Sequence, residues 1–98
     1  MKKKKESIPS KELGEAIGLA KSGKYQESLR ICKKIAPFNS NNAVYFNVVG
    51  IVCRRLGLFD EAVMNSRRAL EIDKKLVAAK MNIANIDFDR GNLNEAIE

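Results

Sequence analysis

The sequence contains no histidine and no tryptophan, and only two prolines and two cysteines in 98 residues. Without an imidazole, the His-dependent catalytic triads and dyads and most zinc sites are excluded. No run of apolar residues approaches the roughly 18 that a membrane-spanning helix needs. The chain has the length of one domain. We therefore expect a single domain that is not an enzyme, does not span a membrane, and holds no metal or cofactor.

Acidic residues are outnumbered by basic ones, 12 to 18, and the formal net charge is +6. Four of the positive charges are consecutive, at Lys2–Lys5. Such a run can attract nucleic acid or an anionic surface, but no aromatic residue is interleaved with it, and we favour a solubilising terminus. Residues 6–10 provide no apolar stretch of the kind that follows the charged start of a secretory signal. With two cysteines and no export signal, we expect a cytoplasmic protein.

The glycines reveal an internal repeat, because Gly23, Gly57 and Gly91 are spaced 34 residues apart. After each glycine comes a bulky apolar residue two places on, a glutamate four places on and a small residue five places on. The bulky residues are Tyr25, Phe59 and Leu93, the acids Glu27, Glu61 and Glu95, and the small residues Ser28, Ala62 and Ala96. A period of this length indicates stacked supersecondary units.

Apolar residues recur at spacings of three and four on both sides of each glycine, which predicts two helices per period with the glycine ending the first. Gly50, in the middle of a predicted helix, is expected to permit a close approach of neighbouring helices. The predicted helices cover 9–22, 25–36, 42–56, 59–72 and 76–90, followed by a short helix at 93–98. Residues 1–8 are expected to form a flexible basic tail, and 9–98 the domain, with repeats at 9–42, 43–76 and, incomplete, 77–98.

This pattern resembles the tetratricopeptide repeat, with two full repeats and a partial third. In the middle period, the family's positions are occupied by Phe46, Val49, Gly50, Gly57, Phe59, Ala62, Ala69 and Leu70. Lys74 stands where the family usually has proline and Cys53 where tyrosine is common, so helix ends and local packing should differ. The resemblance implies an all-α fold, a right-handed α-solenoid of antiparallel helix pairs.

The resemblance also implies a function in protein–protein interaction, as a scaffold or adaptor that binds a peptide or a partner helix in a concave groove. By the geometry of the family, the groove would present Leu13, Ile17, Lys21, Asn47, Ile51, Arg54, Arg55, Met81, Asn82, Asn85, Phe88 and Asp89. One branch of the family clamps the C-terminal carboxylate of chaperones with Lys, Asn and Arg. Those places hold Leu13, Ile17, Val48, Ala78 and Asn82 here, so that ligand is not expected.

The predicted last helix is cut short at Glu98, which would leave an apolar face uncovered. Either further repeats belong to the protein, or a second copy covers this face, formed by Ile83, Ile86, Leu93 and Ile97. An alternative function is that of an N-terminal substrate-recruiting module of a larger glycosyltransferase, methyltransferase or kinase.

Two further features of the sequence are given a structural interpretation. Cys32 and Cys53 fall on apolar helix stripes, where cysteine behaves as a small core residue. Asp87 and Asp89 imitate the Asp-x-Asp of metal-dependent sugar transferases, but side chains two apart on a helix point to different faces. No metal site is expected there. The sequence does not identify the partner.

Overall fold

The computed structural model describes residues 4–97, with side chains described for residues 11–92. The fold is all-helical, and no strand occurs within the described residues. Residues 4–97 form five α-helices and one 3-10 helix: α1 (Lys4–Lys21), α2 (Tyr25–Ile35), η1 (Ala36–Phe38), α3 (Ala43–Arg55), α4 (Phe59–Ile72) and α5 (Val77–Ile97). None of these helices combines the length and apolarity that crossing a bilayer requires.

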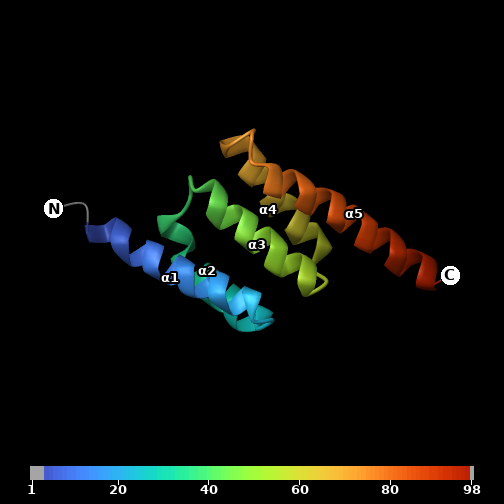
Figure 1. Ribbon diagram of the computed structural model, residues 1–98, viewed down its shortest axis with the longest axis horizontal. Coiled ribbons are helices and arrows are strands. Elements are labelled where there is room, and N and C mark those ends of the chain that lie inside the picture. The colour runs from blue at the N-terminus through green and yellow to red at the C-terminus, as the bar shows by residue number, and fades with distance from the viewer. Residues whose placement is uncertain (1–3, 98) are drawn as a thin grey trace.

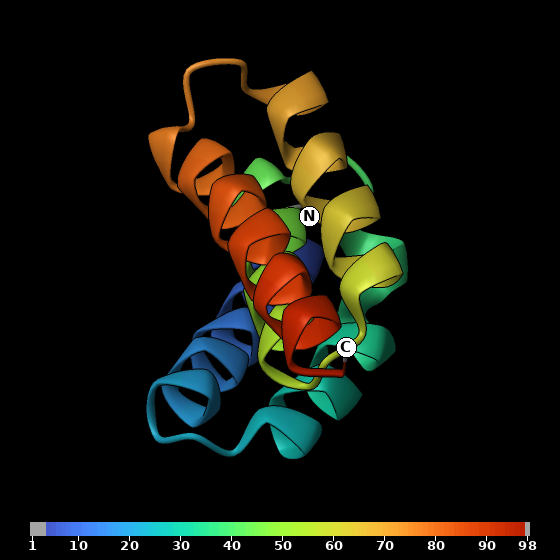
Figure 2. The same cartoon turned by 90° about the vertical axis from the view of Figure 1, so that its right-hand side faces the viewer.

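The helices form two layers. α1 packs on α2, α3 packs on α4, and α5 packs on both α3 and α4. α1, α3 and α5 face the viewer in Figure 1, with α2 and α4 behind them. Figure 2 shows the same layers from the side, with α1 and α5 to the left and α2 and α4 to the right. The layer of α1, α3 and α5 is therefore one continuous face of the molecule.

The turns after α1 and α3 have the same structure, as the repeat predicts. Gly23 and Gly57 have φ angles of 82° and 80°, the left-handed conformation that glycine adopts without steric cost. In both turns the amide of the residue after the glycine donates to the carbonyl five positions back, over 2.9 Å. These are the hydrogen bonds of a Schellman helix end. The 34-residue period is thus confirmed at its first two glycines.

The third glycine behaves differently, and the predicted break at Gly91 is wrong. α5 continues through Gly91 to Ile97, so the short separate helix expected at 93–98 is absent. Extending an existing helix adds one hydrogen bond per residue, whereas starting a new one requires a costly nucleus. A glycine inside a helix costs only about 1 kcal/mol relative to alanine. A helix can therefore continue through Gly91 at little cost.

The first helix also differs from its predicted start at residue 9, since α1 begins at Lys4. Lysine and glutamate, which dominate residues 2–6, are good helix formers. The side chains of Lys2–Lys5 lie outside the described residues, so a role for them in surface binding remains a prediction.

The core lies between the two layers and contains small residues where helices approach closely. Ala16, Ala62 and Ala69 are fully buried. Gly50 lies where α3 meets both α4 and α5. A Cβ added to Gly50 would overlap Ser66 Oγ and would lie 3.0 Å from Asn82 Nδ2. The predicted close approach at Gly50 is confirmed.

Candidate functional site

The face formed by α1, α3 and α5 carries a cavity of about 370 Å³ between α1 and α3. Four of its lining side chains are apolar, three are basic and one is a tyrosine. They are Ile17, Ala20, Val48 and Ile51, then Lys21, Arg54 and Arg55, and Tyr25. We call this cavity the α1–α3 pocket. Its apolar floor with a charged rim is the arrangement typical of ligand sites.

Helical spacing explains why these side chains meet. Ile17 and Lys21 are four residues apart on α1 and so project from the same face. Ile51 and Arg55 have the same spacing on α3. Since the two helices are neighbours in one layer, both pairs face the space between them. The basic residues fall in the last turn of their helices, where a positive charge interacts favourably with the helix dipole.

Arg55 is held in place by the aromatic residue that begins α2. Its guanidinium carbon lies 5.5 Å from the centre of the Tyr25 ring, which is a cation–π contact. Its Nε also donates a hydrogen bond to the Tyr25 hydroxyl over 3.1 Å. Because Nε is the only Arg55 nitrogen engaged in a described hydrogen bond, Nη1 and Nη2 remain available for an acceptor outside the chain.

Arg54 lies deeper than Arg55 and is paired with an acid. Its side chain is only 15% exposed, and its Nε lies 3.2 Å from Asp89 Oδ2 on α5. The pair offsets part of the cost of burying the guanidinium, although Nε is not aligned for a hydrogen bond. Arg54 and Arg55 also line a second cavity of about 520 Å³ together with Asp89 and Phe59. The two cavities therefore share Arg54 and Arg55 at the end of α3.

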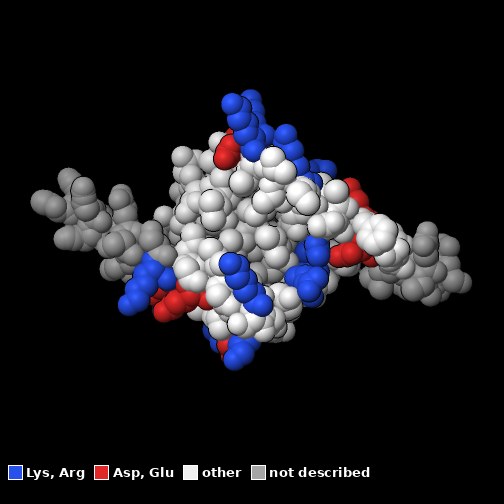
Figure 3. Space-filling model, in the orientation of Figure 1, with Lys and Arg blue, Asp and Glu red and all other residues white. Residues whose placement is uncertain are grey.

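The charge of the α1–α3 pocket is strongly one-sided, because none of the eight lining residues is acidic. Lys21 and Arg55 have no carboxylate partner among the ion pairs of the described residues. Figure 3 shows this face with a largely uncharged centre and with both basic and acidic side chains around it. The pocket thus combines apolar surface with positive charge that the chain itself does not neutralise.

The residues expected in the groove divide into three groups: some line the α1–α3 pocket, some are buried, and the rest lie on α5. Ile17, Lys21, Ile51, Arg54 and Arg55 come together in the α1–α3 pocket. Ala20, Tyr25 and Val48 line the same pocket but were not assigned to it from the sequence. In the sequence, Tyr25 stood out only as the bulky residue two places after Gly23, and its proximity to Arg55 is a tertiary feature.

Three of the expected groove residues are buried instead. Leu13, Asn47 and Asn82 are 8%, 9% and 3% exposed, which leaves them little surface for a ligand. Asn82 Nδ2 donates to Ser66 Oγ over 2.7 Å, so this amide belongs to the interface of α4 and α5. Asn47 Oδ1 is buried without a hydrogen-bond partner among the described residues.

The other expected groove residues lie on the surface of α5. Met81 and Phe88 are 60% and 67% exposed, and Asn85 is also exposed. Val77 is 61% exposed and lies on the same side of the helix as Met81 and Phe88. α5 therefore presents a stripe of large apolar side chains to solvent.

The apolar face expected to be uncovered is not open as predicted. Ile86 is fully buried and belongs to the core cluster, because α5 packs this side against α3 and α4. Ile83 is half-buried. The side chains of Leu93 and Ile97 lie outside the described residues. Exposed apolar surface on α5 is instead provided by Val77, Met81 and Phe88.

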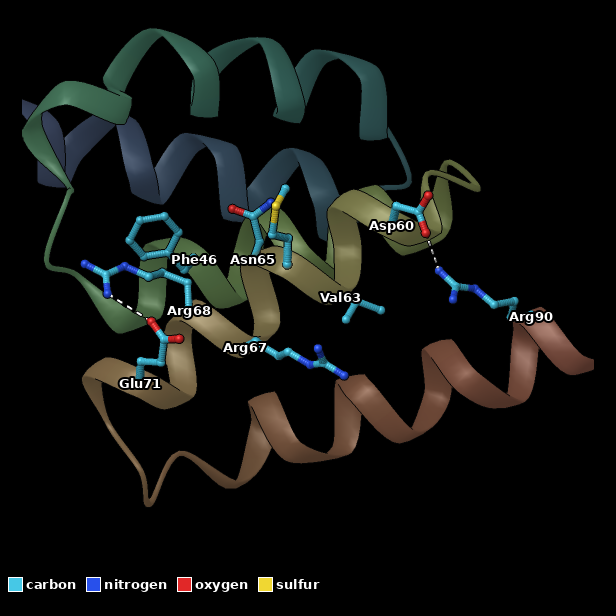
Figure 4. A pocket seen from close by; sticks show the side chains of 9 residues that line it. Phe46, Asp60, Val63, Asn65, Arg67, Arg68, Glu71 and Arg90 are labelled. Carbon is cyan, nitrogen blue, oxygen red and sulfur yellow. Dashed lines mark hydrogen bonds and ion pairs between the residues drawn. The ribbon is translucent and has the colours of Figure 1, made fainter.

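A larger and shallower cavity of about 700 Å³ lies over α4 (Figure 4). Arg90 reaches from α5 toward Asp60, with a nitrogen–oxygen distance of 2.9 Å. Arg68 lies over the ring of Phe46 and also contacts Glu71 at 3.1 Å. Two of the three arginines in this cavity are thus already paired with carboxylates of the chain. Its charge is more nearly balanced than that of the α1–α3 pocket.

The two cysteines are core residues. Cys32 and Cys53 are fully or nearly fully buried and unpaired. Burial raises the pKa of each thiol to about 11, so both are protonated at neutral pH and are poor nucleophiles. Burial likewise raises the pKa of Tyr45 to about 12, and its hydroxyl donates to the Cys32 carbonyl over 2.8 Å.

Asp87 and Asp89 on α5 lie in different environments and do not form a common site. Asp87 is exposed, whereas Asp89 contacts Arg54. Among the described residues, no three His, Cys, Asp or Glu side chains lie close enough together to hold a metal ion.

No protein-family model matches the chain, and no curated protein sequence matches it.

Proposed function

We propose that this chain is a tetratricopeptide-like scaffold that binds a protein partner, as a peptide or a helix, in the groove of α1, α3 and α5. In this proposal α1 with α2 and α3 with α4 are antiparallel pairs of a right-handed solenoid, and α5 begins a third unit. The 34-residue sequence period and the two equivalent turns at Gly23 and Gly57 support it.

The observation that carries the functional proposal is the α1–α3 pocket. Five residues that the family's geometry assigns to the groove, three of them basic, line this one cavity. The pocket is lined by apolar and basic side chains, and the family's geometry would make this the binding face. An interaction module needs no catalytic group, and the proposal assigns none.

Selection from a random peptide library displayed on phage, with the full chain as bait, tests this proposal. A selected peptide is synthesised, and its affinity is measured by fluorescence anisotropy for the wild type and for Ile51→Gln. Burying an aliphatic contact is worth about 1.5–3 kcal/mol, so we expect Ile51→Gln to weaken binding about tenfold or more.

Met64→Gln is the matched control, because Met64 is 63% exposed and lies on α4, in the other layer. It should leave the affinity unchanged. Enrichment of no sequence, or equal weakening by both variants, would contradict binding in the groove.

Self-association is a second candidate function, favoured by the exposed stripe of α5. Val77, Met81 and Phe88 are separated by four and seven residues, the spacing by which helices pair along one seam. Exposed apolar stripes of this kind mark interaction surfaces. We propose that a second copy of the chain covers this stripe.

Light scattering over a concentration series tests this candidate. A dimer that dissociates on Phe88→Ser supports it, provided that Phe38→Ser, at the 64% exposed phenylalanine of η1, leaves the dimer intact. A monomer at every concentration rules it out.

A further inference from the structure

We infer that the ligand of the α1–α3 pocket is an acidic peptide segment, with a side-chain carboxylate held by Arg55 and Lys21 and an apolar side chain on the floor beneath them. This inference rests on the proposed function and names the chemistry of its partner.

The first step is the unbalanced charge of the pocket. Lys21, Arg54 and Arg55 supply three positive charges, and the lining contains no acid. Within the part of the chain whose side chains are described, only Arg54 of these three forms an ion pair, with Asp89. A cleft whose positive charges are not neutralised by its own acidic residues attracts anionic ligands and raises their association rate. Basic and neutral peptide segments gain no binding energy from the positive potential of the pocket.

The second step is the preorganisation of Arg55. The Tyr25 ring and hydroxyl hold the guanidinium from one side. The Nη1 and Nη2 edge is then free to form two parallel hydrogen bonds with a carboxylate, the geometry in which arginine binds acids most strongly. An already oriented side chain loses less conformational entropy when the ligand binds.

The third step is the apolar floor. Ile17, Val48 and Ile51 lie in the same pocket as the basic residues. A carboxylate alone would leave this surface exposed to water, whereas a neighbouring Leu, Met or Phe side chain would bury it. The site thus fits a segment in which acidic and large apolar residues alternate or lie on one face.

The α4 cavity of Figure 4 contains an arginine in the same setting as Arg55 but with a carboxylate partner. Arg68 also lies over an aromatic ring, at 5.7 Å from the centre of Phe46, but its guanidinium contacts Glu71. Arg68 and Arg55 therefore both stack on an aromatic ring. They differ in that Arg68 pairs with Glu71, whereas Arg55 forms no ion pair among the described residues. This makes Arg68→Gln the matched control for Arg55→Gln.

The test uses the peptides enriched by phage selection on the full chain, resynthesised with an amidated C-terminus so that only side chains supply carboxylates. We expect the enriched sequences to be acidic and to contain a large apolar residue. Arg55→Gln should weaken binding about tenfold. Arg68→Gln should leave it within about twofold. Raising NaCl from about 0.05 M to about 0.5 M should weaken the wild type and affect Arg55→Gln less.

Thermal unfolding followed by circular dichroism verifies that both variants remain folded. Enriched peptides that are neutral or basic, or acidic peptides whose affinity Arg55→Gln and Arg68→Gln reduce equally, would overturn the acidic-ligand inference. If such peptides still depend on Ile51, the proposed groove function survives. If nothing is enriched at all, the proposed function itself fails.

Discussion

Substitution of Gly50 by alanine should destabilise the fold, although alanine is the better helix former. The added methyl would overlap Ser66 Oγ and approach Asn82 Nδ2 to 3.0 Å and the Ala62 carbonyl oxygen to 3.3 Å. Rotating Ser66 away would break the 2.7 Å bond from Asn82 and leave a buried amide unpaired, at a cost of about 1–3 kcal/mol. Overpacking adds a further cost of about 1–3 kcal/mol. The helix-propensity gain of about 1 kcal/mol does not offset these terms.

Gly18→Ala is the matched control, since Gly18 lies within α1 and a Cβ there would meet nothing within 4 Å. It should stabilise the chain by about 0.5–1 kcal/mol, through helix propensity alone. Both variants are compared with the wild type by urea unfolding followed by circular dichroism. We expect a net loss of about 1–5 kcal/mol for Gly50→Ala, which corresponds to a thermal midpoint lower by several degrees or more.

A stability gain for Gly50→Ala equal to that of Gly18→Ala would refute the close approach of α3, α4 and α5 at this residue. A double-mutant cycle with Ser66→Ala identifies the cause. If the overlap with Ser66 Oγ is responsible, Gly50→Ala should cost less in the Ser66→Ala background. An unchanged cost would assign the effect to Asn82 Nδ2 and the Ala62 carbonyl instead.

Two other outcomes follow from the backbone and the thiols. Gly57→Ala should lower the free energy of unfolding by about 1–2 kcal/mol, because Gly57 has a φ of 80°. Gly91→Ala lies inside α5 and should raise it by up to about 1 kcal/mol. A loss of stability for Gly91→Ala similar to that for Gly57→Ala would contradict the continuous helix. Burial raises the pKa of Cys32 and Cys53 from 9.0 to about 11, so the unfolded state loses thiol protons first and stability should fall as pH rises from about 9 to about 11. Urea unfolding across this range should show a smaller pH dependence for Cys53→Ala, and an unchanged pH dependence would exclude the thiol as its source.

Much of the local structure could be predicted from the sequence, because it depends on neighbours along the chain. The spacing of apolar residues located five helices to within a few residues at most ends. The left-handed turns at Gly23 and Gly57 follow from the freedom of glycine at a helix end. The same rule was wrong at Gly91, where the sequence pattern is equivalent but α5 continues. A helix-ending glycine acts only where a following helix gains enough packing to offset its nucleation.

The residues expected in the groove show most clearly what the sequence could predict and what it could not. The resemblance to the tetratricopeptide repeat assigned Ile17, Lys21, Ile51 and Arg55 to the groove, and these side chains do meet in one pocket. The same resemblance assigned Asn47 and Asn82 to the groove, yet both are buried, because the exposure of a helix side depends on how its neighbours pack. The stacking of Arg55 on Tyr25 and the pairing of Arg54 with Asp89 join residues 30 or more positions apart.

Most of the helices, the 34-residue period and the residue types on each helix side could be predicted, since these depend on interactions within a few residues of the chain. Which of those sides is core and which is surface depended on how the helices pack. This packing buried Ile86 and left Met81 and Phe88 exposed, and it brought three basic side chains around one apolar pocket. The physical reason is that burial and charge neutralisation are properties of helix packing, where distant segments either cover a side chain or leave it to solvent.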